Sequence, residues 1–150
     1  MPPWDTARPF SLAISSNYPF APSAARQAIS AGLWQFGGIL GADGQDIHID
    51  YDPDCNVNIN PQFAAAVSPS NRSRIVVCPR YAQSLKDVGG DEAKTADVTI
   101  KHELGHVLGL DYHASTGLMK AVNDGSLRMF QTSDIAAICG AGHVISPACD

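Results

Sequence analysis

The residues of this 150-residue chain that could carry out chemistry are concentrated in the pentapeptide His102-Glu103-Leu104-Gly105-His106. In a helix, residues four apart differ by roughly 40° in direction, so the two imidazoles project from one face and can share a metal ion. Glu103 lies on the next flank of the helix, where its carboxylate could accept a proton from a water molecule on that metal. The pentapeptide is short enough to occur by chance in helices that bind nothing, so its surroundings must be considered as well.

Three further features follow the pentapeptide and strengthen the prediction of a metal site. Gly109 stands three residues after His106, where a glycine lets the chain leave the helix through a left-handed turn. A third histidine, His113, comes almost at once. Met119 then follows in the turn-like segment 117–119. A buried methionine is ordinarily core filler, but here it accompanies three histidines and a helix-ending glycine.

Residues 102–119 resemble the metzincin zinc peptidases, whose pattern is His-Glu-x-x-His-x-x-Gly-x-x-His followed by a Met-turn. Residues 102–110 are especially similar to the matrixin branch, that of the matrix metalloproteases and their small bacterial relatives. The resemblance implies a zinc-dependent endopeptidase acting on protein or peptide substrates, with Glu103 as proton acceptor and Met119 as a structural methionine. It also implies that the substrate pairs with an edge strand and that residues 120–130 determine specificity.

The chain departs from the metzincin pattern at the third ligand. The pattern puts that ligand at Tyr112, whereas Asp111 stands one residue earlier and His113 one residue later. Either the turn carries an extra residue and His113 binds Zn²⁺, or Asp111 replaces it. We favour His113 because neutral imidazole is the commonest metal ligand and a loop can absorb an insertion. An alternative function is a zincin-fold recognition module that binds zinc without cleaving; the intact Glu103 argues against it.

The pattern of the whole chain predicts an α+β fold of zincin type: a small twisted sheet, a backing helix, an active-site helix and a C-terminal helix. We expect the backing helix at 22–36, with Ala25, Ala28, Ile29, Leu33 and Phe36 on its buried face. The active-site helix should begin near Thr95, and the C-terminal helix should be capped by Thr132 or Ser133. Strands are expected at 8–15, 47–51 and 74–78, with shorter strand-capable pieces at 57–59 and 64–67.

Composition agrees with one small domain covering residues 1–150, which we expect to be a monomer. The net charge is −5, and the 10 Lys and Arg residues are scattered, so nucleic acid is not an expected partner. There is no apolar run close to the length that spans a membrane. Residues 1–5 lack the features of a signal peptide, so a secreted protein would already have lost its leader.

Four cysteines indicate an oxidising, extracellular environment. Cys55, Cys78, Cys139 and Cys149 form no Cys-x-x-Cys pair, which argues against a second zinc site and a thioredoxin-type motif. We expect two disulfides and favour Cys55 with Cys78 and Cys139 with Cys149, because each would close a local part of the domain. The first would contribute on the order of 3 kcal/mol to stability.

Other candidate sites are weaker. Matrixin-like folds often hold structural Ca²⁺, and the acids at Asp43, in 50–54 and in 89–92 could contribute oxygens, although solvated turn acids are the favoured interpretation. His48 and His143 are interpreted as structural or surface histidines.

Overall fold

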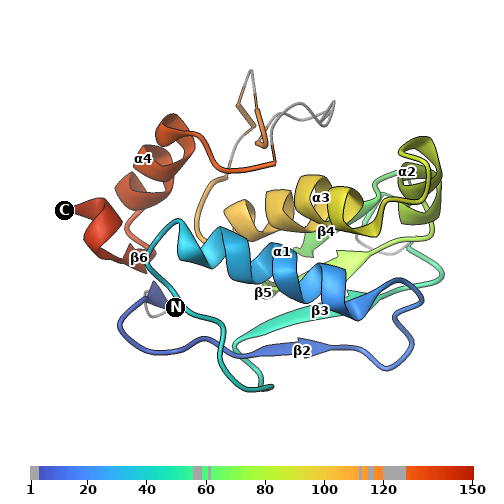
Figure 1. The fold of residues 1–150 in the computed structure, drawn as a ribbon, viewed down its shortest axis with the longest axis horizontal. Helices are drawn as coiled ribbons and strands as arrows, with labels where there is room; N and C mark the ends of the chain where they lie inside the picture. Colours follow the sequence, from blue (N-terminus) through green and yellow to red (C-terminus); the bar gives the residue numbers. More distant parts are fainter. Residues whose placement is uncertain (1–3, 56–58, 61, 112, 115–116, 120–127) are drawn as a thin grey trace.

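The structure, a computed structural model, describes residues 4–55, 59–60, 62–111, 113–114, 117–119 and 128–150. Its main sheet contains, in spatial order, β2 (Leu12–Ile14), β3 (Ile47–Tyr51), β5 (Asn71–Val77) and β4 (Ala65–Ser68). The first three strands are parallel, and β4 runs antiparallel to β5 at the edge of the sheet. Helices combined with a small mixed sheet confirm the predicted α+β class (Figure 1).

Two long helices, α1 (Pro22–Trp34) and α3 (Glu92–Val107), lie side by side against the sheet (Figure 1). The five residues expected on the buried face of the backing helix are all buried, but α1 ends at Trp34, two residues before the predicted end, so Phe36 lies beyond it. Gly32 allows the close approach of the two helices, because a Cβ atom there would lie 2.6 Å from Leu104 Cδ2. The backing helix thus packs directly on the helix that carries the histidines.

The main core lies between these helices and one face of the sheet. Its sheet side chains are those of Leu12, Ile47, Ile49, Ile75 and Val77, which share one buried cluster with both helices. A second, smaller cluster is formed by Cys55, Ile59, Val76 and Cys78. Since Val76 stands between Ile75 and Val77 on β5, it points to the opposite face of the sheet. The helices and this second cluster therefore cover the two faces of the sheet.

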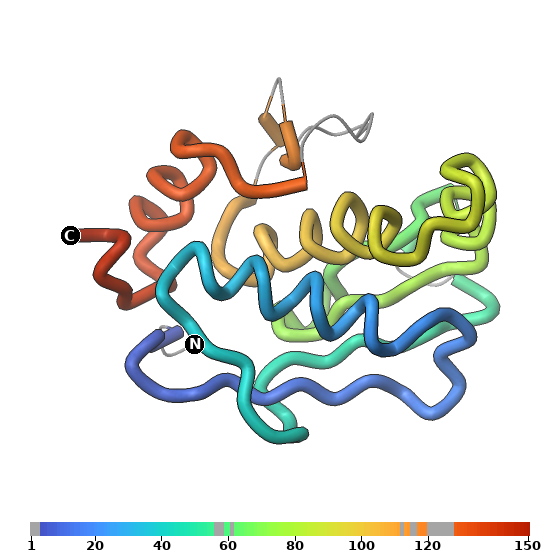
Figure 2. The backbone as a smooth tube through the Cα atoms, viewed as in Figure 1, coloured from blue at the N-terminus to red at the C-terminus, as the bar shows by residue number. Residues whose placement is uncertain are grey.

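The C-terminal segment consists of α4 (Thr132–Gly140), β6 (Val144–Ile145) and the short 3₁₀ helix η1 (Pro147–Cys149). Strand β6 pairs in parallel with β1 (Trp4–Asp5), so the first described residues lie beside the end of the chain (Figure 2). Disulfides join Cys55 to Cys78 and Cys139 to Cys149, as the sequence predicted. The second of them fastens α4 to η1.

The active-site helix starts earlier than predicted. It begins at Glu92, and its cap is Asp91, whose carboxylate accepts a hydrogen bond from the backbone N–H of Lys94 at 3.0 Å. Thr95 lies inside the helix, where its hydroxyl donates to the Asp91 carbonyl at 2.8 Å. The expected cap at Thr95 was wrong because Asp91 satisfies the free N–H groups of the first turn instead.

Other boundaries also differ from the predictions. Helix α4 is capped by Gln131, which forms a reciprocal capping box with Asp134, and neither expected hydroxyl residue is the cap. The strand expected at 8–15 is continuous only over Leu12–Ile14, with a separate bridge between Phe10 and Leu40. Helix α2 (Tyr81–Asp87) was not predicted. The strand-capable piece at 57–59 lies mostly outside the described residues. Among the described helices, none combines the length and apolarity that crossing a membrane requires.

Candidate metal centre

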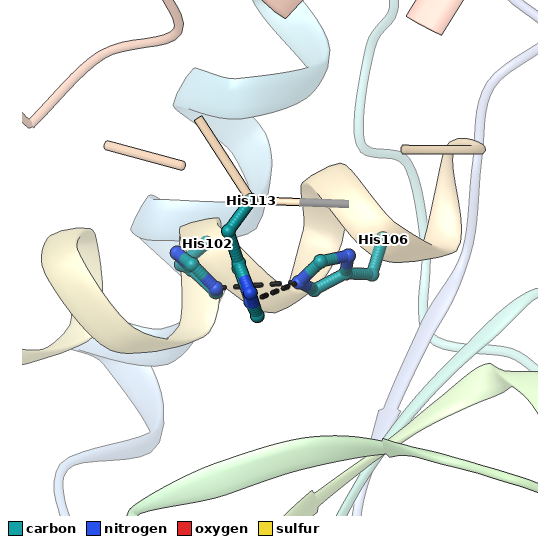
Figure 3. A group of neighbouring side chains, drawn as sticks. All are labelled: His102, His106 and His113. Atoms are coloured by element: carbon teal, nitrogen blue, oxygen red, sulfur yellow. Dashed lines mark hydrogen bonds between the residues drawn. The ribbon is translucent and has the colours of Figure 1, made fainter. Parts of the chain in front are cut away.

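Helix α3 places His102 and His106 on one face, one helical turn apart, as their spacing predicts. Figure 3 shows both rings extending from α3 toward the ring of His113, which comes from the segment after the helix. His102 is buried, His106 is half-buried and His113 is exposed. The site therefore lies at the buried C-terminal half of α3, with the side of His113 open to solvent.

The imidazole nitrogens of the three residues converge. The Nε2 atom of His106 lies 3.3 Å from Nε2 of His102 and 3.3 Å from Nε2 of His113 (Figure 3). One ligand atom from each residue can be chosen so that all three lie within 4.8 Å of one another. These three histidines are the group within the described part of the chain that could hold a metal ion.

The other ring nitrogens of the two helix histidines face backbone carbonyls. The Nδ1 atom of His102 lies 2.7 Å from the Leu118 carbonyl oxygen, and Nδ1 of His106 contacts the Leu110 carbonyl oxygen. A carbonyl oxygen only accepts hydrogen bonds, so each Nδ1 must carry the proton. In the neutral rings, both Nε2 atoms then present lone pairs toward the site.

Burial favours the neutral form of both rings. It lowers the pKa of His102 to about 4, with a further lowering by its histidine neighbours, against the opposing hydrogen bond to Leu118. Burial also lowers the pKa of His106, although the Leu110 carbonyl opposes this. A hydrogen bond between the two Nε2 atoms would need one ring to be doubly protonated, which these lowered pKa values oppose. The lone pairs of the two Nε2 atoms therefore face each other at 3.3 Å. A cation bound by both atoms would stabilise this arrangement.

The spacing of the nitrogens fits a zinc ion. Zn–N bonds of about 2.0–2.1 Å at tetrahedral angles put two ligand nitrogens about 3.3–3.4 Å apart. The separations from His106 to His102 and His113 are both 3.3 Å. Three imidazoles are also a donor set that zinc accepts readily, with a fourth position left for water or substrate.

Asp111, the alternative third ligand, lies outside this group. Its carboxylate Oδ1 is 2.9 Å from Nη2 of Arg72, with which it forms an ion pair. The backbone N–H of Ala114, directly after His113, donates to the Met119 carbonyl at 2.8 Å. The structure therefore brings His113, and not Asp111, to the two helix histidines. Tyr112 lies outside the described residues.

Glu103 lies beside the histidines in a buried environment. Only 8% of its surface is exposed, and its Oε1 atom is 3.9 Å from Nε2 of His102. Burial raises the pKa of Glu103 to about 8, although a backbone hydrogen bond from Val67 on β4 acts in the opposite direction. A positive charge held by the adjacent imidazoles would favour the carboxylate form. The side chain is thus fixed between the histidines and the edge strand.

Met119 lies beneath the histidines in the core. It is fully buried, and a Cβ atom at Gly105 would lie 2.6 Å from its sulfur atom. Gly105 stands between the two histidines on α3, so the absence of a side chain there allows the methionine to reach the helix. Met119 therefore packs in the core against the part of α3 that carries the histidines.

The segment expected to determine specificity is described only from residue 128 onward; residues 120–127 lie outside the described part. Lys101, buried next to His102, donates to the Arg128 carbonyl at 2.7 Å and pairs with Asp97 at 3.2 Å. Arg128 also pairs with Asp97, at 2.7 Å. An open hollow of about 380 Å³ lies between α1, Lys101 and Met129, but none of the site histidines lines it.

Several of the remaining candidate residues have structural partners. Asp43 pairs with Arg26, Asp50 pairs with Arg74, and Asp91 caps α3. His143 packs against Gly109, where an added Cβ would lie 2.9 Å from its ring. A structural Ca²⁺ site among these acids stays a prediction.

Sequence reasoning missed three groups that contact the site residues. The Leu110 and Leu118 carbonyls fix the tautomers of the histidines, and backbone groups carry no signal in a sequence. Arg72 donates both to the His106 carbonyl and to Asp111 from a strand more than thirty residues away. Only the tertiary fold makes that connection.

No protein-family model matches this chain, and a search of curated proteins finds no significant match.

Proposed function

We propose that this protein is a zinc-dependent endopeptidase. The observation that carries the proposal is the convergence of His102, His106 and His113 at separations that suit a tetrahedral zinc ion, with Glu103 beside them. The local resemblance of residues 102–119 to the metzincins supports the same function. Three histidines with an open position are typical of a catalytic zinc site and not of a closed structural one.

When bound, zinc would supply Lewis acidity, which polarises a substrate carbonyl and makes a water molecule more acidic. His102, His106 and His113 would hold the ion, and the Leu118 and Leu110 carbonyls would keep the first two rings in the ligand tautomer. Glu103 would accept a proton from the attacking water as the carbonyl carbon is attacked. It would then deliver that proton to the nitrogen of the departing amine. The amine therefore leaves as a neutral group and not as an amide anion.

The substrate is proposed to be an extended peptide. Strand β4 is an edge strand, so one side of its backbone is not paired within the main sheet. It also lies next to α3, the helix that carries Glu103. An extended segment added to that edge would run past Glu103, which is hydrogen-bonded to Val67 of β4. Backbone pairing of this kind holds a peptide with little dependence on its side chains.

Substitution of Glu103 tests the proposal. Glu103→Ala should retain zinc, because every proposed ligand remains, while kcat/KM for a denatured protein such as casein falls by about 100-fold or more. Zinc content of the purified variant serves as the control, and a chelator should abolish hydrolysis by the parent. A variant that keeps near-native turnover would exclude Glu103 as the proton acceptor. A parent protein that holds zinc without cleaving would instead favour the recognition module.

We also propose that the protein acts outside the cell as a monomer. Two disulfides are compatible with an oxidising compartment, since cytosolic thiols are kept reduced. Mass analysis of the unreduced natural protein checks this, because four alkylatable thiols would indicate a reducing compartment.

A further inference from the structure

Arg72 links the two ends of the turn that carries the chain from α3 toward His113. It lies near the start of β5, and its Nη2 atom donates to the His106 carbonyl at 3.3 Å and to the Asp111 carboxylate at 2.9 Å. His106 is the second histidine of the site, and Asp111 stands two residues before His113. One guanidinium group therefore spans the turn between two of the proposed ligands.

The same turn orients His106 as well. Leu110, which lies inside it, accepts the contact from Nδ1 of His106 through its carbonyl and donates its own N–H to the Gly105 carbonyl at 3.0 Å. Gly109 takes a φ of +126°, which is the conformation that lets the chain turn back at this point. A change in the conformation of the turn would thus alter the positions of both His106 and His113.

The exposed ring of His113 depends on anchors on either side of it. On the C-terminal side, the Ala114 N–H donates to the Met119 carbonyl at 2.8 Å. On the N-terminal side, Asp111 is held by Arg72. Because the ring itself is exposed, burial in the core does not fix its position.

We propose that Arg72, acting through Asp111, is a positioning residue that holds His113 at the metal site; this inference rests on the zinc-binding part of the proposed function. The role of Asp111 is then that of a partner to Arg72. The side chains of the pair are 41% and 74% exposed, so it should contribute little to folding stability. Its effect should fall on metal affinity, where residues that support ligands commonly change binding by about 10–100-fold.

A second ion pair on the same strand provides a matched control. Arg74 lies two residues along β5, pairs with Asp50 at 2.8 Å, and has a similarly exposed side chain, at 45%. Substitution of Arg74 by alanine removes one positive charge from β5, as substitution of Arg72 does. Arg74→Ala should therefore reproduce every effect of Arg72→Ala except the loss of the contact to the turn.

The test is the dissociation constant for Zn²⁺, with Co²⁺ absorption as a measure of site geometry, for metal-free parent, Arg72→Ala and Arg74→Ala proteins. We expect Arg72→Ala to raise the zinc dissociation constant by about 10–100-fold and to weaken the tetrahedral Co²⁺ bands. Arg74→Ala should stay within about twofold of the parent, and the thermal midpoints of the metal-free proteins should agree. Equal zinc affinities for the two variants would overturn the inference.

Two further variants separate positioning from other roles. In a His113→Ala background, Arg72→Ala should have a much smaller effect on zinc binding than in the parent, because the residue that it chiefly positions is gone. An undiminished effect there would overturn the inference. If Arg72→Ala does not fold, Asp111→Ala tests the same ion pair, since it breaks the pair and leaves the contact of Arg72 with the His106 carbonyl in place. A parent that binds zinc without hydrolysing protein would refute the proposed peptidase and leave this inference standing, whereas a parent that binds no zinc would refute both.

Discussion

His113 stands one residue beyond the position that the metzincin pattern gives to the third ligand. Its Nε2 atom nevertheless lies 3.3 Å from that of His106, so the turn after α3 absorbs the extra residue. Residue type was a useful guide here, because imidazole is a commoner ligand than carboxylate. The carboxylate of Asp111, the alternative ligand, instead forms an ion pair with Arg72.

Substitutions at the two candidate ligands should separate their roles. His113→Ala should raise the zinc dissociation constant by more than about 100-fold, beyond the range for supporting residues, and lower hydrolysis with it. Asp111→Asn should change zinc affinity by less than about 10-fold, because the amide oxygen can still accept a hydrogen bond from Arg72. Zinc dissociation constants for both variants check this. Parent-like zinc binding by His113→Ala would show that another residue completes the site.

Helix α3 illustrates what spacing can and cannot predict. Its amphipathic centre was predicted, but its start was placed at Thr95 and not at Glu92, because the first turn holds few apolar residues. Asp91, the actual cap, follows two glycines and was interpreted as a turn acid or a calcium ligand. Helix α2 was missed for a related reason: it is seven residues long, and only Tyr81 of it is buried. Short elements depend on tertiary contacts that local patterns do not contain.

Gly109 should be indispensable to the exit from α3. Its φ of +126° disfavours any other residue, and a Cβ there would lie 2.9 Å from His143 Cδ2 and 3.2 Å from Ala141 Cβ. We expect Gly109→Ala to reduce the free energy of unfolding by about 2–3 kcal/mol, combining strain and overpacking. Gly140→Ala, at a helical position with open space, should be neutral or stabilising by up to about 1 kcal/mol. Thermal unfolding that affects both variants equally would contradict this explanation.

For the whole molecule, the sequence predicted the α+β class, the backing helix with four of its buried residues, and both disulfides. These follow from periodicity and from cysteine spacing. The pairing of β1 with β6 could not be predicted, because each strand has two residues and they lie at opposite ends of the chain. The same limit applies to the site: the ligand types were visible in the sequence, while Arg72 and the two carbonyls reach it only through the fold.

Zinc titration of the metal-free protein is the most direct test of the proposed activity. Hydrolysis of denatured casein should be absent before zinc is added and should then rise in proportion to the bound metal. It should stop rising at one zinc ion per chain, because the three histidines form one site with an open position. Undiminished hydrolysis by the metal-free protein, or no hydrolysis when one zinc ion is bound, would contradict a zinc-dependent endopeptidase.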